Sequence, residues 1–161
     1  MIRELKVGEL QIIQDLAKII WPVSFKDMIS AEQISYMLNW MYNVKKLEED
    51  QHKGHIYLLY TEEDVPLGFA SYELKRLEST VRIHKLYVHQ DCQNKGIGRI
   101  LLEHVKNLVR NEEIDYLDLF VNRTNPAVGF YKSTGFYVEE EVNMDIGNGY
   151  FMNDYLMKTK I

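Results

Sequence analysis

The stretch from Arg82 to Arg110 constrains the fold most, because the spacing of its apolar residues changes from that of a strand to that of a helix. Its first part carries apolar residues among β-favouring neighbours, and its last part carries apolar residues at helical spacing. Gly96 and Gly98 flank the expected start of the helix. The first N–H groups of a helix lack intrahelical partners and lie at the positive end of its dipole. The stretch therefore predicts a strand, a phosphate-binding turn and a helix.

Two familiar phosphate loops do not fit this turn. A dinucleotide-binding loop needs a third glycine where the chain has Leu101, and a P-loop needs a lysine after its glycine, whereas Lys95 precedes Gly96. The remaining hexad resembles the Q/R-x-x-G-x-G/A signature of the GNAT superfamily of N-acetyltransferases, where it holds the pyrophosphate of coenzyme A. The hexad consists of Gln93, Asn94, Lys95, Gly96, Ile97 and Gly98.

A second motif follows in the order that the GNAT superfamily has. After a strand that begins near Leu117, the sequence is similar to the later family motif of an asparagine, an alanine, a Phe-Tyr pair and a Gly-Phe pair. The matching residues are Asn125, Ala127, Phe130, Tyr131, Gly135 and Phe136. This resemblance covers residues 55 to 161, and it implies acetyl-CoA as the cosubstrate.

Length and composition indicate one domain over residues 1–161, because 161 residues with three prolines show no compositional break. We expect a cytoplasmic protein, since the first residues lack the apolar core of a signal peptide and no apolar run could span a bilayer. The single Cys92 allows no internal disulfide. The formal net charge of −5 argues against nucleic acid as a partner and favours cationic small molecules.

The pattern along the chain predicts the remaining elements. Residues 1–7 alternate as in an edge strand, and residues 9–20 have the spacing of a helix that should end at Trp21-Pro22. Ser30, with Gln33 three residues later, has the position of an N-cap for a second helix, whose aromatic residues are expected to be mostly core. Further strands are predicted at 55–60, 67–74, 136–138 and 151–158.

This order matches the α/β (α+β) fold class of the GNAT superfamily. The resemblance implies a mixed, mostly antiparallel, twisted seven-stranded sheet flanked by helices. It also implies that the fourth strand and the parallel fifth strand splay apart, so that the cofactor pairs with backbone groups left without ladder partners. By the same resemblance, the pantetheine and acetyl contacts fall on Leu86, Tyr87 and Val88. The pyrophosphate contacts fall on Gln93, Asn94, Lys95, Gly96, Ile97, Gly98 and Arg99, and Asn125 anchors the pantetheine.

The implied reaction is direct transfer of an acetyl group to an amine. An amine attacks only when neutral, and alkyl ammonium groups have a pKa of about 10, so a base or a water chain must take the proton. Tyr131 matches the position of the family's general acid for the leaving thiolate and lies next to the cofactor. His84 is the first candidate base, because period-two counting puts it on the same strand face as Leu86 and Val88. Glu73 and a water relay are the alternatives.

Other groups of histidine, cysteine and acidic residues do not have the spacing of a known metal or nucleophile site. The five histidines show no H-E-x-x-H spacing and one cysteine forms no thiolate cluster, so we predict no metal. His89 and Cys92 lack an oriented third partner for nucleophilic catalysis. The acidic runs at 48–50, 62–64 and 139–141 are expected to be solvated loops and strand edges.

Two further segments and the charge balance bear on the acceptor. Residues 33–42 and 146–155 resemble bacterial diamine and polyamine acetyltransferases, which together with the acidic balance predicts a small-molecule polyamine or diamine. Glu32, Glu73 and Asp154 are the candidates to bind the distal ammonium. A protein or peptide N-terminus, an amino acid or an aminoglycoside stays open as acceptor, as do a homodimer and a non-catalytic acetyl-CoA sensor or interaction module.

Overall fold

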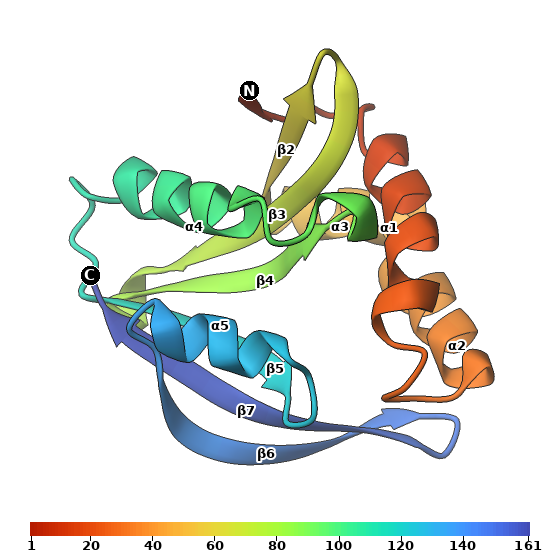
Figure 1. Cartoon of the computed structure of the whole chain (residues 1–161). Helices are drawn as coiled ribbons and strands as arrows, with labels where there is room; N and C mark the ends of the chain where they lie inside the picture. The colour runs from red at the N-terminus through yellow and green to blue at the C-terminus, as the bar shows by residue number, and fades with distance from the viewer.

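The computed structural model describes all 161 residues as seven strands, five α-helices and two 3₁₀ helices (Figure 1). The strands are β1 (Ile2–Glu4), β2 (Ile56–Glu62), β3 (Val65–Lys75), β4 (Thr80–Val88), β5 (Tyr116–Asn122), β6 (Tyr137–Gly147) and β7 (Tyr150–Lys160). The α-helices are α1 (Gln11–Ser24), α2 (Ala31–Met41), α3 (Val44–His52), α4 (Ile97–Leu108) and α5 (Ala127–Ser133). The 3₁₀ helices are η1 (Arg76–Glu78) and η2 (Gln90–Cys92).

All seven strands form one sheet in the order β1-β2-β3-β4-β5-β7-β6, which confirms the predicted mixed sheet. Every neighbouring pair is antiparallel except β4 and β5, which are parallel. The β4–β5 ladder contains only four residue pairs, from Thr80–Tyr116 to Ile83–Leu119. Beyond Ile83 the two strands have no register with each other, so the predicted splay is present and leaves backbone groups on both strands without ladder partners.

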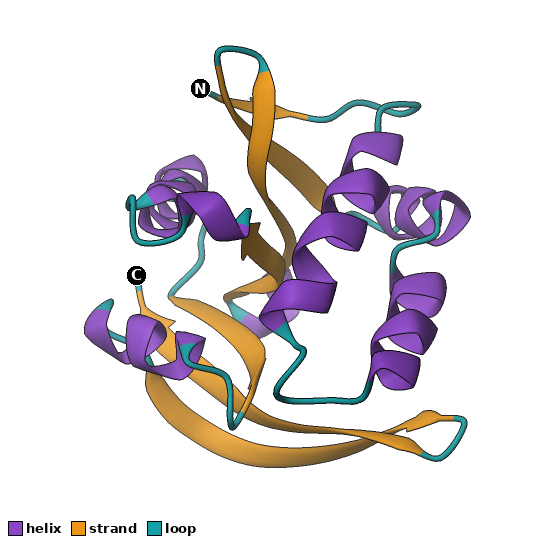
Figure 2. Cartoon of the chain, turned by 45° about the vertical axis from the view of Figure 1, so that its right-hand side comes forward, coloured by secondary structure: helices purple, strands orange, loops and turns teal.

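Helices cover both faces of the sheet, and each face has its own hydrophobic cluster (Figures 1 and 2). The cluster under α4 and α5 includes Ile83, Leu101, Leu119 and Tyr131. The cluster under α1, α2 and α3 includes Ile13, Trp21, Tyr42, Tyr57 and Phe69. Strand residues alternate between these two clusters because successive side chains point to opposite faces.

Helix α1 continues through the proline that was expected to end it. Pro22 lies inside the helix, and the N–H of Phe25 donates to the carbonyl of Trp21 at 3.0 Å. Trp21 is 1% exposed and stacks on Phe25 with ring centroids 4.4 Å apart. Burial of the two rings offsets the backbone hydrogen bond that proline cannot make, so the predicted boundary is wrong.

The second helix begins as predicted, and a third follows that the sequence pattern did not reveal. The Ser30 hydroxyl accepts from the N–H of Gln33 at 3.1 Å, which caps α2. Helix α3 begins in the same way at Asn43. The acidic run expected to be a solvated loop lies in this helix, and Asp50 is buried at 2.8 Å from Lys46. The other two acidic runs occupy the β2–β3 turn and the edge strand β6.

A β-bulge interrupts the pairing of β3 and β4 at His84. Ser71 pairs with Lys85 and Tyr72 pairs with Ile83, so His84 has no opposite residue. An extra residue breaks the period-two alternation. Leu86 and Val88 pack against the α4–α5 cluster, whereas the His84 imidazole points to Glu73 and stacks on His55. The expectation that His84 shares a face with Leu86 and Val88 is therefore wrong.

The β6–β7 hairpin reaches the end of α2 (Figures 1 and 2). The Tyr36 hydroxyl donates to the carbonyl of Ile146 at 2.8 Å, and the Gln33 amide donates to the carbonyl of Phe151 at 3.1 Å. Trp40 stacks on Tyr36 but is 43% exposed, so for this residue the core expectation is wrong. None of the helices has the length and apolar character that a membrane crossing requires.

Candidate active site

A cleft of about 810 Å³ opens where β4 and β5 part. The α4–α5 side of its wall includes Ile97, Gly98, Phe130 and Tyr131, and the opposite side includes Trp21, Phe25, Gln33 and Met37. The β6–β7 hairpin adds Met144, Phe151, Met152 and Asp154. A mostly apolar cleft with a few polar groups at the separation of two strands has the form of a small-molecule site.

One end of the cleft is a row of backbone N–H groups at the start of α4. The N–H groups of residues 93–99 donate no hydrogen bond within the protein. Gly96 has φ +81°, and a Cβ added there would meet no atom within 4 Å. This left-handed conformation turns the chain into the helix and leaves free space in front of the amides. Free amides at the positive end of a helix dipole fit the pyrophosphate of coenzyme A.

The other residues that the sequence assigns to the cofactor also lie around the cleft, with one exception. Leu86, Tyr87 and Val88 form its β4 wall, next to the region where β5 no longer pairs. Asn125 lines the cleft, but its Oδ1 accepts from the N–H of Ala127, the first residue of α5, at 2.9 Å. Lys95 is exposed and does not line the cleft, whereas Arg99 does.

Tyr131 presents a buried phenol to the cleft from α5. The residue is 7% exposed, and its hydroxyl makes no hydrogen bond within the protein. Its ring packs against Phe130 and Phe136 at centroid distances of 5.2 and 5.5 Å. Burial raises the pKa of Tyr131, so the phenol stays protonated at neutral pH. A protonated, fixed phenol can donate a proton to a base in the cleft.

Asp154 is a buried carboxyl group on β7 that faces the same cleft. The residue is 2% exposed, and its carboxylate forms neither a salt bridge nor a hydrogen bond within the protein. Arg123 donates to the Asp154 backbone carbonyl instead, at 3.2 Å. Burial raises the pKa of Asp154 to about 6, and the nearby Arg123 opposes this shift.

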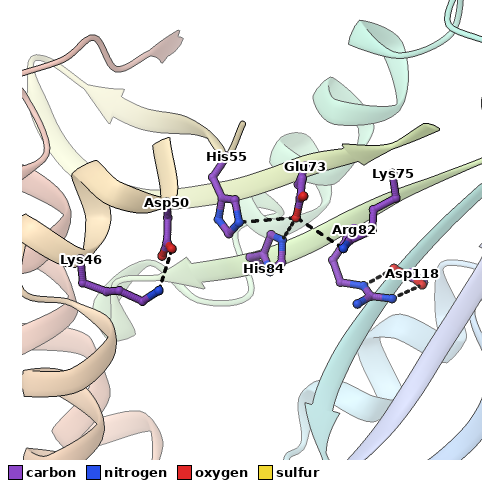
Figure 3. Close-up of polar contacts among 8 residues, drawn as sticks. All are labelled: Lys46, Asp50, His55, Glu73, Lys75, Arg82, His84 and Asp118. Carbon is purple, nitrogen blue, oxygen red and sulfur yellow. Dashed lines mark hydrogen bonds and ion pairs between the residues drawn. The ribbon is translucent and has the colours of Figure 1, made fainter. Parts of the chain in front are cut away.

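His84 lines the cleft. Glu73 holds its imidazole by a hydrogen bond, as Figure 3 shows. Its Nε2 is 2.8 Å from Oε2 of Glu73, and Nε2 of His55 is 3.4 Å from the same oxygen. Burial lowers the pKa of His84 to about 4, although the hydrogen bond with Glu73 opposes this shift. Burial also lowers the pKa of His55, so both imidazoles are neutral at pH 7.

His55, Glu73 and His84 also have the residue types of a metal site, with donor atoms within 4.8 Å of one another. However, the two imidazole planes are 9° from parallel, with centroids 4.0 Å apart. Imidazole lone pairs lie in the ring plane, so nearly parallel rings do not direct them at one point. The geometry suits two rings sharing a carboxylate better than metal ligation. That the protein uses no metal stays a prediction.

A family model described as an acetyltransferase (GNAT) domain matches residues 25–149 of the chain. The chain belongs to the GNAT family. It is 26% identical over 151 residues to the spermidine N(1)-acetyltransferase of Thermoplasma acidophilum, a match that covers 89% of this chain and 92% of that protein. It is 33% identical over 98 residues to the peptidyl-lysine N-acetyltransferase YjaB of Salmonella typhimurium, a match that covers 59% of each.

Solved GNAT structures have the same fold. The PaiA N-acetyltransferase of Thermoplasma acidophilum, in complex with coenzyme A, superposes with a TM-score of 0.84 at 23% identity over 100% of this chain and 98% of that one. The ribosomal-protein-S18-alanine N-acetyltransferase of Escherichia coli superposes with a TM-score of 0.75 at 18% identity, over 100% and 93%. The chain is thus an acetyltransferase of the GNAT family by its sequence, with the family's sheet and helices.

Several residues of this GNAT site differ from the sequence interpretation. Of the three carboxylates expected at the acceptor entrance, only Asp154 lines the cleft. Glu73 is engaged by the histidines, and Glu32 is exposed in the first turn of α2. In agreement with the sequence interpretation, the side chains of His89 and Cys92 make no hydrogen bond with each other, and Nδ1 of His89 accepts from the N–H of Asp91 at 3.2 Å.

Lys85 is a cleft residue that the sequence interpretation missed. It is 6% exposed and forms no salt bridge, and its Nζ lies 5.1 Å from the centre of the Tyr42 ring. Burial lowers its pKa to about 8. The neighbouring residues in the sequence did not indicate that Lys85 is buried, because a lysine in a half-buried strand normally faces water.

Proposed function

We propose that the chain transfers the acetyl group of acetyl-CoA directly to a primary amine of a diamine or polyamine. The observation that carries this acceptor class is Asp154, a buried carboxylate that faces the cleft without a partner. An unpaired buried charge is costly, and an ammonium group of the acceptor would pair with it. The relative named spermidine N(1)-acetyltransferase supports the same class.

The donor half of the proposed site rests on backbone groups. The free N–H groups of residues 93–99 would hold the pyrophosphate, with Arg99 adding charge. The unpaired edge of Leu86, Tyr87 and Val88 would bind the pantetheine as a strand, with Asn125 on the other side of the cleft. When bound, acetyl-CoA supplies a thioester carbonyl for the amine to attack.

Two side chains would move the protons. His84 is neutral and can take the proton that the acceptor nitrogen loses when it forms the new bond to carbon. Tyr131 is protonated and can donate to the sulfur as the carbon–sulfur bond breaks. The two groups lie on different sides of the splay, His84 on β4 and Tyr131 on α5, so that proton removal and proton donation are separated.

A lysine side chain of a peptide is the second candidate acceptor, because it also presents a primary amine and one relative is named for that activity. A peptide lysine has no second ammonium group at the spacing of a diamine, so it would make no use of Asp154. Substitution of Asp154 by asparagine should therefore slow transfer to a diamine and leave transfer to a lysine peptide nearly unchanged.

Release of free coenzyme A thiol tests the proposal with a panel of spermidine, a diamine, the monoamine of equal length and a lysine peptide. We expect the highest kcat/KM for the diamine or spermidine. Thiol release above the no-acceptor rate with none of these compounds would favour the acetyl-CoA sensor over the enzyme. A highest kcat/KM for the lysine peptide would replace the polyamine class with peptidyl lysine.

The remaining expectations belong to the same proposal. We also propose a single domain over residues 1–161, a cytoplasmic location and, from the composition and net charge, no nucleic-acid or membrane partner. A homodimer stays a prediction.

A further inference from the structure

Two imidazole rings contact the same carboxylate oxygen of Glu73, next to the proposed site of proton transfer. Nε2 of His84 lies 2.8 Å from Oε2 of Glu73, and Nε2 of His55 lies 3.4 Å from it (Figure 3). The two rings stack with centroids 4.0 Å apart. The three side chains come from β2–β4, since His55 directly precedes β2. The bulge at His84 is what turns its ring toward this carboxylate.

The hydrogen-bond partners indicate where the protons of the two imidazoles lie. Nδ1 of His55 is buried and has no partner, so its proton is better placed on Nε2, which faces Glu73. Nε2 of His84 faces the same carboxylate, and its Nδ1 also has no partner in the protein. His84 lines the cleft, unlike His55 and Glu73. The lone pair left on Nδ1 is therefore the basic atom that His84 can offer to a ligand.

The charges around the cluster favour an ionised carboxylate. Burial alone would raise the pKa of Glu73, but the His84 hydrogen bond and Lys75, 3.9 Å away, lower it. Arg82 also faces Glu73 but is paired with Asp118 at 2.7 Å. On the other side, the positive charge of Lys85 lowers the pKa of both imidazoles. Asp50 raises the pKa of His55, and Lys46 lowers it. A negative Glu73 beneath two neutral imidazoles can stabilise one added proton.

We propose that Glu73 and His55 are positioning residues for the base of this reaction. The inference rests on the proposed role of His84. Glu73 holds His84 in the tautomer with Nε2–H, which keeps Nδ1 free for the acceptor. His55 stacks on the ring and occupies the same oxygen, which prevents the His84 ring from turning away. When the acceptor N–H bond breaks, the proton goes to Nδ1, and the imidazolium formed is paired with the Glu73 carboxylate.

The kinetic test compares Glu73→Gln, His55→Ala and His55→Phe with the wild-type enzyme. Glu73→Gln should lower kcat/KM for the amine by about 10²-fold, the lower end of the range for acid–base catalysis. His55→Ala should lower it by about tenfold, a loss comparable to one hydrogen bond, and His55→Phe by less because it keeps the stacked ring. The KM for acetyl-CoA should not change, because none of these residues lies in the amide row of residues 93–99.

Two control variants separate positioning from general electrostatics and stability. Lys75→Gln removes a charge next to Glu73 without touching either ring, and His52→Ala removes an exposed histidine of α3. Both should leave kcat/KM within about twofold of wild type, as expected of surface substitutions. A loss with Lys75→Gln as large as with Glu73→Gln would mean that the effect does not come from the contact between Glu73 and His84, and would overturn the proposal.

NMR of the imidazole nitrogens gives a readout that a merely structural role would not move. In the wild type at pH 7, His84 should be the Nε2–H tautomer, and in Glu73→Gln it should become a mixture with a lower pKa, because the stabilising negative charge is gone. A wild-type His84 protonated on Nδ1 would overturn the proposal, even if a variant failed to fold.

The variant His84→Gln separates the role of the base from the positioning roles of Glu73 and His55. If His84→Gln leaves the single-turnover rate unchanged, the proposed base is wrong and the positioning roles are wrong with it. If His84→Gln slows that rate while Glu73→Gln and His55→Ala do not, only the positioning roles are wrong.

Discussion

Replacing Asp154 by asparagine tests the buried carboxylate on which the proposed acceptor class depends. The two side chains are nearly equal in size, so the substitution removes the charge and keeps the shape of the cleft. Asp154 is 2% exposed, and burial raises its pKa from the ordinary 3.8 to about 6. The folded protein therefore binds this proton more tightly than the unfolded chain does.

The sign and size of the stability effect follow from that shift. The carboxyl group contributes stability below its unfolded pKa of 3.8, and this contribution is lost as the pH rises through about 6. A shift of about two pKa units corresponds to about 3 kcal/mol. At pH 7.5, Asp154→Asn should therefore raise the free energy of unfolding by about 2–3 kcal/mol, or the Tm by roughly 5–10 °C. Near pH 4 the gain should almost vanish.

Urea unfolding at both pH values measures this gain, with Asp64→Asn in the exposed β2–β3 turn as the matched control. The same variant should lose about 10- to 100-fold in kcat/KM for a diamine, because a charged hydrogen-bond partner is removed. Unchanged or lower stability at pH 7.5, or an equal gain at both pH values, would refute the buried-charge reasoning. Unchanged diamine kinetics would remove Asp154 from the acceptor site.

Three further predictions concern the donor, the acid and the acceptor. Gly96→Val should lower the affinity for acetyl-CoA, measured by calorimetry, by more than about tenfold, because a side chain at φ +81° is strained and fills the space before the amides. Unchanged affinity in a folded variant would place the pyrophosphate elsewhere. Tyr131→Phe should retain acetyl-CoA binding but slow single turnover by about 10²–10⁴-fold, and an undiminished rate would make Tyr131 a packing residue. The kcat/KM for the diamine should be higher than that for the monoamine of equal length. Most of this difference should persist in added salt, because Asp154 is buried. Equal kcat/KM values for the two amines would exclude the polyamine class.

The geometry proposed to hold the pyrophosphate was predictable from the sequence because its determinants are local. The glycine turn, the amide row of residues 93–99 and the start of α4 lie within one short segment, so their relative positions follow from hydrogen-bonding rules. The Ser30 cap was predictable for the same reason. The splay of β4 and β5 came from the family resemblance, since a pattern within single strands does not state where a ladder ends.

The cluster of His55, Glu73 and His84 was not predictable because it depends on contacts between distant segments. His55 and His84 meet only through the pairing of β2, β3 and β4, and the bulge changes the direction of the His84 ring. The end of α1 was mispredicted because Trp21 and Phe25 gain burial that outweighs the local effect of Pro22. Helix α3 was missed because its segment is mostly charged and buries only Leu47 and Asp50.

The four-residue ladder between β4 and β5 divides the sheet into two parts that are each continuous in the chain. The first part contains β1 to β4, and the second contains β5, β6 and β7, with a connection between Leu108 and Tyr116 that joins α4 to β5. A polypeptide cut in this connection would give two fragments whose only strand-to-strand contact is that ladder. Acetyl-CoA bound in the proposed cleft would touch both fragments, at the amide row on one and at Tyr131 on the other. We therefore expect acetyl-CoA to promote reassembly of the two fragments. The connection between α4 and β5 would then be a suitable place to split the chain for a reporter of acetyl-CoA.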